Sequence, residues 1–451
     1  MFFYLCIFML AFAPLVRGGN RPLPLLALEG AGLLGLAALA WSRSRDTWQA
    51  RLPATLWWGM GILILVPLVQ LIPLPWTWWP LFPGHEPYAH ALDLAGGAGT
   101  GVRAMTVNAR ATEYAALALL PCLAVFFMVQ RLDPRQLRRL AILFVAVAVG
   151  EALLGIVQGG APPRSLLHLG NPYGGGGATG TYVNRNHFAA LMAMALPMLI
   201  ALWSQAMLPS VSSRGEVLRD HPRNADVKLA LRILFSILAM ILLLALLMTR
   251  SRAGIGTGLV VFALASVGLV WRAGSKQARA ALVAVAIGAV LLGFYVGLTP
   301  VLEKFAPDEF SLQYSGRMQL AQATLRAGLD FVPFGSGLGT FADVFRRYQA
   351  DRLTGFIDHA HNDYAEAFLE LGVAAIAAVV LLGLAYVARW RQLARVRLSR
   401  SLGFLQVAAG LGMLAMIVHA AFDFNFHIPA NAIYFSFLAG VFFFTPGEDR
   451  A

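Results

Sequence analysis

The chain has 451 residues, of which 58% are hydrophobic and only 13% are charged, and its mean hydropathy is +0.67. This composition excludes an ordinary soluble globular domain and indicates a protein whose solvent is lipid. The formal net charge of +12 does not indicate nucleic-acid binding, because the Lys and Arg residues fall in short loops between apolar runs and are not gathered on a soluble surface.

Twelve apolar stretches are long enough to cross a bilayer as helices. In chain order they are residues 1–16, 22–41, 54–73, 112–130, 139–158, 188–204, 229–249, 253–271, 280–298, 367–388, 403–421 and 430–446. The first has neither a basic beginning nor a clear cleavage site, so we interpret it as a retained helix and not as a signal peptide. Cys6 and Cys122 both lie in these stretches, which excludes a disulfide framework and a cysteine-based zinc site. We expect an all-α integral membrane protein of about twelve transmembrane helices, forming a single polytopic membrane domain over residues 1–451.

Basic residues are concentrated in alternate loops, and the positive-inside rule places those loops in the cytoplasm together with both termini. They are Arg43, Arg45, Arg51, Arg131, Arg135, Arg138, Arg139, Arg214, Arg219, Arg223, Lys228, Arg272, Lys276, Arg279, Arg389, Arg391, Arg395, Arg397 and Arg400. The segments 74–111, 159–187, 299–366 and 422–429 then lie on the outer face.

The largest outer segment, 299–366, contains helical patterns and is not a disordered linker. Its residues 316–329 predict a helix with Ser315 as a candidate N-cap, and residues 341–350 predict a second helix. Proline and glycine residues between the two predict an irregular connection. We therefore expect a large, partly helical periplasmic loop between the ninth and tenth helices.

The outer segment 168–187 is a glycine-rich loop that leads into a helix, with Arg185 and His187 near the start of that helix. Glycines let backbone N–H groups approach an anion, and the helix N-terminus favours negative charge. Arg185 is thus a candidate for binding a phosphate group through two hydrogen bonds. The alternative is a flexible loop whose arginine only meets lipid headgroups.

Two further arginines, Arg250 and Arg252, lie in a short outer turn between two apolar helices. Positive charge on the outer face runs against the usual bias of membrane proteins, so it requires an explanation. One explanation is that the side chains extend to the membrane interface. The other is an anionic ligand bound at the outer leaflet.

The segment 358–372, "DHAHNDYAEAFLELG", places two His, two Asp and one Asn within its first six residues. A neutral histidine here can take a proton from a hydroxyl, and a nearby aspartate can fix its tautomer. One alternative is a metal site, although we find no clear set of further ligands and predict none. The other alternative is a solvated helix start with Asp358 or Asn362 as the cap.

Ionisable residues also occur within the predicted helices, where they are functional candidates by default. Glu29 and Glu151 have the alternative of pairing inside the helix bundle, and His419 lies near the end of its helix. For Asp423 and His427, the alternative is that they only order the short turn 422–429.

In this order, the motifs resemble the O-antigen ligase and O-antigen polymerase superfamily, polytopic bacterial glycosyltransferases of the GT-C type. The matching segments are "TGTYVNRNHFAALM" (179–192), "SRAG" (251–254), "GRMQLAQATLRAGLDFVPFGSGLGTF" (316–341) and "HAHNDYAEAFLELG" (359–372). The resemblance covers roughly residues 140–440. The run of glycines at 174–177 is longer than the family pattern.

The resemblance implies transfer of a glycan from undecaprenyl pyrophosphate at the periplasmic face of the inner membrane. The acceptor is the lipid A core for ligases and another repeat unit for polymerases, and residues 419–437 favour a polymerase of exopolysaccharide or lipopolysaccharide synthesis. Polysaccharide chain-length or export proteins are candidate partners, and we expect no cofactor and no nucleic acid. The alternative function is a secondary transporter or a flippase for lipid-linked oligosaccharides, which an internal repeat and a midplane binding site would indicate.

The resemblance also implies roles for individual residues. Arg185 and Arg252 bind the pyrophosphate, and His361 lies beside the acceptor. Their neighbours Arg250 and His359 can exchange roles with them. We add Arg317 and Asn184 to the substrate-binding residues and Asp363 to the catalytic ones.

Overall fold

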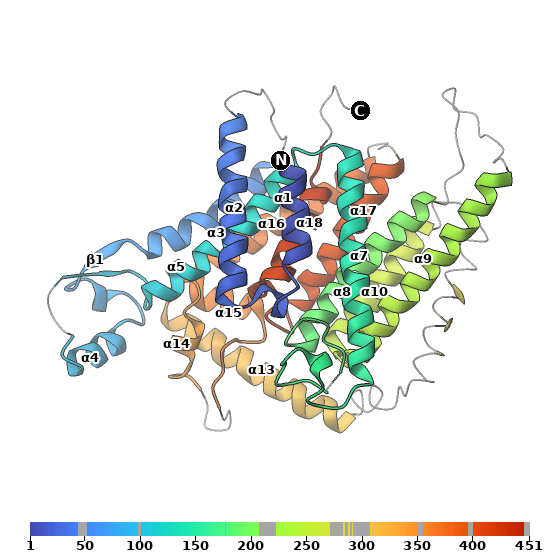
Figure 1. The fold of residues 1–451 in the computed structure, drawn as a ribbon. Coiled ribbons are helices and arrows are strands. Elements are labelled where there is room, and N and C mark those ends of the chain that lie inside the picture. Colours follow the sequence, from blue (N-terminus) through green and yellow to red (C-terminus); the bar gives the residue numbers. More distant parts are fainter. Residues whose placement is uncertain are drawn as a thin grey trace.

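The computed structural model describes residues 1–43, 52–97, 101–175, 177–206, 222–270, 307–349, 355–395 and 400–445, with a few residues between 283 and 291. The helices are α1 (Phe2–Phe12), α2 (Pro22–Arg43), α3 (Ala54–Gln70), α4 (Glu86–Leu94), α5 (Ala109–Leu117), α6 (Leu119–Val129), α7 (Pro134–Gly159), α8 (Arg185–Ala206), α9 (Pro222–Met248), α10 (Arg252–Ala265), α13 (Pro307–Asp330), α14 (Phe341–Phe345), α15 (Asp363–Leu371), α16 (Val373–Arg395), α17 (Arg400–His419) and α18 (Pro429–Phe442). A short 3-10 helix, η5 (Asn425–His427), joins α17 to α18. Figure 1 shows most of these helices gathered into one bundle, with α4 to one side of it and α13 across its lower end.

Eight spans within the described residues are long and apolar enough to cross a membrane, and α1, α3 and α18 are shorter apolar helices. This confirms a mainly helical, multi-pass membrane protein. The count of twelve stays a prediction, because the expected helix 280–298 lies almost entirely outside the described residues. The basic residues expected in 44–51, 207–221, 271–282 and 396–399 also lie outside them.

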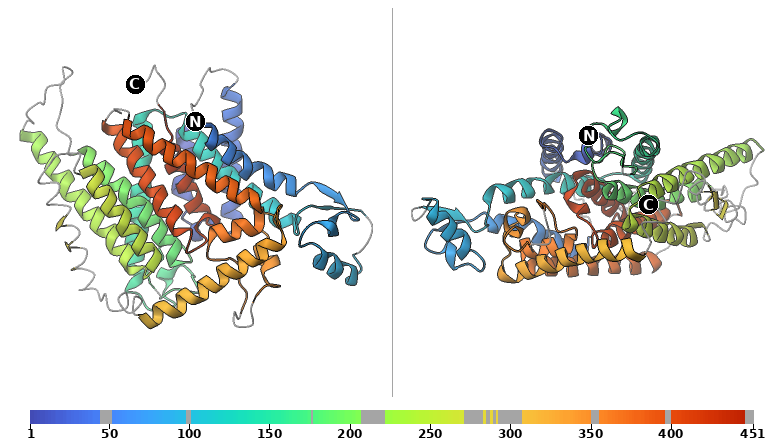
Figure 2. Two further views of the ribbon diagram at one scale, coloured as in Figure 1. Left: turned by 180° about the vertical axis from the view of Figure 1, so that it is seen from behind. Right: turned by 90° about the horizontal axis from the view of Figure 1, so that it is seen from below.

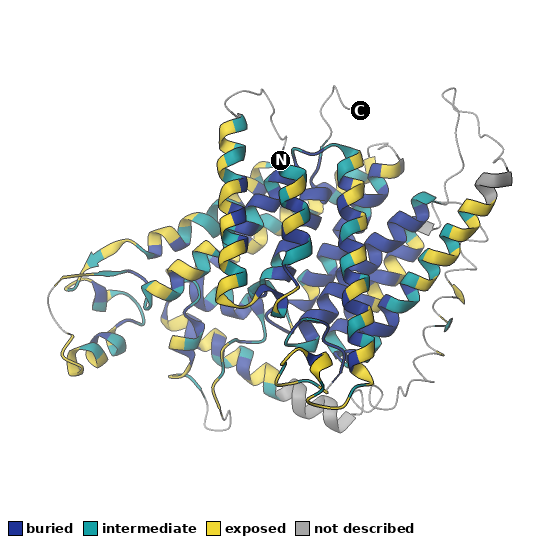
Figure 3. Cartoon of the chain, viewed as in Figure 1, coloured by how far each residue is buried: buried dark blue, intermediate teal, exposed yellow. Residues whose placement is uncertain are grey.

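Helix α8 forms the centre of the bundle, since every residue from Asn186 to Ser204 is buried. It packs against α17, α10, α9 and α7, and Figure 3 shows the buried residues concentrated in these central helices. Small residues make the close contact with α10 possible. A Cβ atom added to Gly254 would lie 2.3 Å from the Cβ of Ala189, so the two helix backbones are nearly in contact.

The two ends of the bundle differ in what they carry. The start of α1, the end of α6 with the start of α7, and the ends of α16 and α18 lie together at the upper end in Figure 1. At this end, Arg389 is buried and donates hydrogen bonds to the carbonyl oxygens of Phe442 (2.8 Å) and Phe444 (2.6 Å). The starts of α8, α10 and α15 lie at the opposite, lower end, which α13 crosses (Figures 1 and 2).

The structure corrects three predicted boundaries. Residues 367–388 do not form one helix, because α15 ends and α16 begins at Gly372, whose φ is +60°. A Cβ atom there would lie 2.1 Å from the carbonyl oxygen of Pro333, so only glycine permits this approach of two chain segments. Helix α13 already begins at Pro307, which puts Ser315 inside the helix and not at its cap. Helix α14 ends at Phe345, short of the predicted residue 350.

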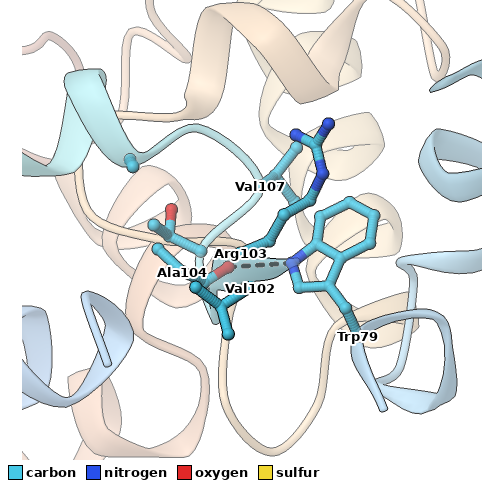
Figure 4. Close-up of a pocket in the computed structure, with 7 residues that line it drawn as sticks. Trp79, Val102, Arg103, Ala104 and Val107 are labelled. Carbon is cyan, nitrogen blue, oxygen red and sulfur yellow. Dashed lines mark hydrogen bonds between the residues drawn. The ribbon is translucent and has the colours of Figure 1, made fainter. Parts of the chain in front are cut away.

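The segment between α3 and α5 contains a feature that the all-α prediction missed. Strands β1 (Pro73–Pro75) and β2 (Val102–Ala104) pair antiparallel, and the segment projects sideways from the bundle. The Trp79 side chain donates a hydrogen bond to the carbonyl oxygen of Ala104 (2.8 Å) beside a cavity of about 250 Å³ that Arg103 also lines (Figure 4). This cavity contains none of the predicted site residues.

The end of α3 braces α15. The Gln70 side chain at the end of α3 donates hydrogen bonds to the carbonyl oxygens of Glu370 (2.8 Å) and Phe334 (3.1 Å) and accepts one from the backbone N–H of Leu338 (3.0 Å). The described part of the large outer segment has its own small core, in which α13, α14 and α15 meet. Its buried apolar residues are Leu320, Ala327, Phe331, Phe341, Val344, Phe345, Ala360 and Leu369. Helix α15 is therefore held from two sides.

Candidate active site

Four predicted arginines come together at the lower end of the bundle. Arg185 is the first residue of α8, and Arg252 is the first residue of α10. The positive charges of Arg250, Arg317 and Arg252 all act on Arg185, although the four residues come from three different parts of the chain. Like charges gathered in this way repel one another, so the arrangement is suited to an anion that several of them share.

The turn that carries Arg250 and Arg252 has a defined geometry. Arg250 has a φ of +54°, a left-handed conformation that costs energy for a residue other than glycine. Ser251 caps α10, because its hydroxyl oxygen accepts a hydrogen bond from the backbone N–H of Gly254 (3.2 Å). The cap fixes the backbone at the start of α10, from which the Arg252 side chain extends.

The glycine-rich loop before α8 is held by two buried side chains of α7. The Glu151 carboxylate accepts hydrogen bonds from the backbone N–H and the hydroxyl group of Thr181, both 2.8 Å long. Gln158 donates a hydrogen bond to the carbonyl oxygen of Gly180 (2.7 Å). Glu151 thus binds this loop and not a basic residue inside the bundle.

Asp423 joins the start of α8 to the histidine-rich segment. It is completely buried, and its Oδ1 accepts a hydrogen bond of 3.0 Å from Nδ1 of His361. Its Oδ2 accepts one from the side chain of Asn186. Nη2 of Arg317 and Nε2 of His187 each lie 3.7 Å from this carboxylate. Three motifs that are far apart in the sequence therefore meet at one carboxylate.

These contacts determine the charge of Asp423. Burial alone would raise its pKa, but His187 and His361 hold the pKa well below its usual value, so the group is a carboxylate. A carboxylate only accepts hydrogen bonds, so Nδ1 of His361 carries the proton. In the neutral form of His361, Nε2 then carries the lone pair, and the side chain is 31% exposed. His361 also has a φ of +50°, a strained left-handed backbone conformation that is uncommon for a residue other than glycine.

A second group of side chains lies beside the first, and we call His359, Asp363, Glu366 and His427 the two-histidine cluster. Nδ1 of His359 lies 2.8 Å from Oε1 of Glu366, and Nε2 of His427 lies 3.3 Å from the same oxygen. Nδ1 of His427 lies 2.9 Å from Oδ1 of Asp363. The other carboxylate oxygen of Glu366 accepts the backbone N–H of Ala360 (2.7 Å).

Burial and charge oppose each other in this cluster. Burial would lower the pKa of His427, but Glu366 and Asp363 raise it to about 10. Burial would raise the pKa of Glu366, but the charge of His427 and the hydrogen bond from His359 lower it. Asp363 has a raised pKa because it is buried, even though His427 acts in the other direction. With this raised pKa, His427 is an imidazolium between the carboxyl groups of Asp363 and Glu366.

The ring of Phe424 separates the two groups. His359 stacks on it, with ring centroids 4.1 Å apart and an angle of 17° between the rings. His361 and His187 meet the same ring with near-perpendicular geometry, at 5.0 and 4.6 Å. Phe424 thus sets the orientation of histidines from both groups.

The comparison with protein families identifies the region that holds these residues. Residues 237–380 match the family model described as O-antigen ligase. Over this region the chain is similar to the O-antigen ligase/polymerase superfamily, and the match supports the resemblance found in its motifs. The match includes Arg250, Arg252, Arg317, His359 and His361, and it ends before Asp423. No curated protein matches the chain.

The match and the membrane spans together indicate a multi-pass bacterial membrane protein that is similar to glycosyltransferases of the O-antigen ligase type. Several predicted residues have well-defined positions. Asn362 caps α15, since its Oδ1 accepts the backbone N–H groups of Tyr364 (3.1 Å) and Ala365 (3.0 Å). The Asn184 side chain accepts a hydrogen bond from the backbone N–H of Asn186 (2.8 Å) at the start of α8. In the structure, this predicted substrate-binding residue therefore makes a helix-capping contact.

The carboxylate that binds His361 is not one of its neighbours in the sequence. We expected a nearby aspartate and named Asp363, but Asp363 binds His427 and the backbone N–H of Phe426 (3.2 Å). The partner of His361 is Asp423. For this residue the sequence leaves two interpretations open: a functional group, or a residue that only orders the turn 422–429. The signal that pointed to it was an ionisable residue at the end of an apolar helix.

Glu366 and His427 were also absent from the predicted site. Together with His359 they place three ligand atoms within 4.8 Å of one another, an arrangement that can hold a metal ion. No clear set of further metal ligands lies near His359 in the sequence. In the structure, Glu366 of α15 and His427 of η5 supply them.

Proposed function

We propose that this chain, as an O-antigen ligase/polymerase-type glycosyltransferase, transfers a glycan from a polyprenyl pyrophosphate to a sugar hydroxyl at the periplasmic face of the inner membrane. The contact of Asp423 with both His361 and the arginine side of the site carries the proposal. It puts a polarised histidine next to a group of positive charges, as a reaction with an anionic leaving group requires.

The arginines form the donor side of the proposed site. As the bond between the anomeric carbon and the phosphate oxygen breaks, its electron pair goes to the pyrophosphate and negative charge grows there. Arg185, Arg250, Arg252 and Arg317 stabilise this charge, and the N-termini of α8 and α10 add the favourable ends of their helix dipoles.

His361 forms the acceptor side. Its Nε2 takes the proton of the attacking hydroxyl while the oxygen forms a bond to the anomeric carbon. Asp423 keeps the proton on Nδ1 and stabilises the imidazolium that results. A single in-line displacement of this kind inverts the configuration at the anomeric carbon.

Within this family we favour a polymerase, for which the acceptor is the end of another repeat unit. The support is the resemblance of residues 419–437 to polymerase-type members, and this stretch supplies Asp423 and His427 to the site. Loss of the gene product should then leave single repeat units on the acceptor. A ligase would leave full-length chains without an acceptor.

The proposal is tested by His361→Ala and Arg252→Ala, assayed separately for surface polysaccharide at matched membrane levels. Each should reduce product about 10²-fold or more, because one variant removes the base and the other removes a charge on the leaving group. Arg326→Ala removes an exposed arginine of α13 and serves as the control, with near-normal product expected. Normal amounts of glycan of normal length from both site variants would refute the proposed site.

A further inference from the structure

A set of metal-ligand groups lies outside the residues used in the proposed reaction. His359 comes from the loop before α15, Glu366 from α15 and His427 from η5. Their Nδ1, carboxylate oxygen and Nε2 atoms all lie within 4.8 Å of one another. Two imidazoles and one carboxylate form a ligand set typical of zinc sites with an open fourth position.

The distances suit a small divalent ion. Bonds of about 2.0–2.1 Å in a tetrahedral site place ligand atoms roughly 3.3 Å apart. Nε2 of His427 lies 3.3 Å from Oε1 of Glu366, and Nδ1 of His359 lies 2.8 Å from it. All three ligand atoms lie within 4.8 Å of one another, so side-chain rotation has to adjust their spacing to the tetrahedral value when the ion binds.

The residues around the ligands hold them in orientation for an ion. Asp363 binds Nδ1 of His427 (2.9 Å), which leaves Nε2 to face the ion, as in many carboxylate–histidine–metal arrangements. The backbone N–H of Ala360 binds one oxygen of Glu366 and leaves the other for the ion. Stacking on Phe424 fixes the ring plane of His359.

The exposure and the charge of these side chains are consistent with metal binding. The side chains of His359 and His427 are 22% and 29% exposed, so solvent reaches the cluster, while Glu366 is only 1% exposed. Two carboxyl groups buried side by side require positive charge nearby. A divalent cation bound by the three ligands supplies that charge.

We propose that His359, Glu366 and His427 bind one zinc-type divalent cation, with Asp363 orienting His427. The three ligands leave a fourth position for water or a sugar oxygen. Binding of the ion does not depend on the glycosyl transfer proposed above.

The experiment uses the tag-free, full-length protein in detergent or nanodiscs, stripped with a chelator and titrated with zinc chloride. Calorimetry and elemental analysis should give one zinc ion per chain. Glu366→Gln and His427→Ala should abolish this binding, and Asp363→Asn should weaken it about 10–100-fold. His90→Ala, which removes an exposed histidine on α4, should bind zinc as the unchanged chain does.

His361→Ala separates the two proposals, because it should lose transfer activity and keep the zinc. Monodisperse elution and thermal unfolding of each variant verify folding. Two results overturn the zinc site: no stoichiometric zinc in the unchanged chain, or full zinc binding in folded Glu366→Gln. Either result leaves the role of His361 standing.

Discussion

His361 has a well-defined chemical setting, although most of its contacts come from outside its own segment. Its Nδ1–H is bound by a completely buried carboxylate, its ring meets Phe424, and its backbone is left-handed. Such a conformation persists only where the surroundings compensate its cost. At the residue scale, these contacts hold the imidazole of His361 in one tautomer and one orientation.

Changing Asp423 to Asn should reduce kcat by about 10²-fold, because the amide no longer fixes the tautomer of His361 or stabilises its charged form. In the His361→Ala background the same change should have little further effect, since the two residues act as a unit. Steady-state kinetics on lipid-linked donor, with the variants at equal membrane levels, measure this. Losses that multiply in the double variant would show that Asp423 acts independently of His361.

Helix ends, more than helix interiors, position the chemistry. Arg185 and Arg252 are the first residues of α8 and α10, and α15 starts directly after His361 and its cap Asn362. The relative placement of these ends depends on close packing between α8 and α10, where Gly254 faces Ala189. At the element scale, a small residue in one helix therefore controls the position of an arginine two residues away.

Gly254→Val should destabilise the bundle by about 1–3 kcal/mol, because the added side chain has no space beside α8. Gly256→Val is the matched control on the same helix, since nothing lies within 4 Å of a Cβ atom added there. Both changes alter helix propensity in the same way, so the difference between them reports packing alone. Thermal unfolding in detergent should show a lower midpoint for Gly254→Val only. Equal midpoints would contradict the close packing.

Arginines lie at both ends of the bundle. Arg131 and Arg135, near the start of α7, and Arg389 of α16 belong to the upper end in Figure 1, and the four site arginines belong to the lower end, where α8 and α10 begin. The sides of the bundle are apolar, and α2 alone exposes Leu23, Leu26, Leu33 and Leu34. With the upper end in the cytoplasm, as the basic loops of the sequence predict, the proposed site lies in the periplasm.

The orientation predicts the outcome of cysteine labelling in intact cells with a membrane-impermeant maleimide. A chain with Arg164→Cys, in the exposed loop after α7, should react from the periplasm. Arg135→Cys, exposed at the other end of α7, should react only after the inner membrane is permeabilised. Because both positions flank one helix, the opposite pattern would invert the whole topology and move the proposed site to the cytoplasm.

The sequence by itself determined the membrane class, most helix positions and the resemblance to a family, because long apolar runs and short polar motifs are local properties of the chain. It also identified Arg185, Arg250, Arg252, Arg317 and His361 as candidates. It did not show the break at Gly372, since the apolar run continues through it and only the approach of Pro333 requires it.

Only the tertiary structure decided which acid serves which histidine. His361 binds Asp423, 62 residues away, and His427 binds Asp363, 64 residues away. These pairs cross over because the turn after α17 folds back onto the start of α15, where the backbone N–H of Asp363 binds the carbonyl oxygen of Ala420 (2.9 Å). Hydrogen bonds form between neighbours in space, and no local pattern in a sequence encodes contacts made across a bundle.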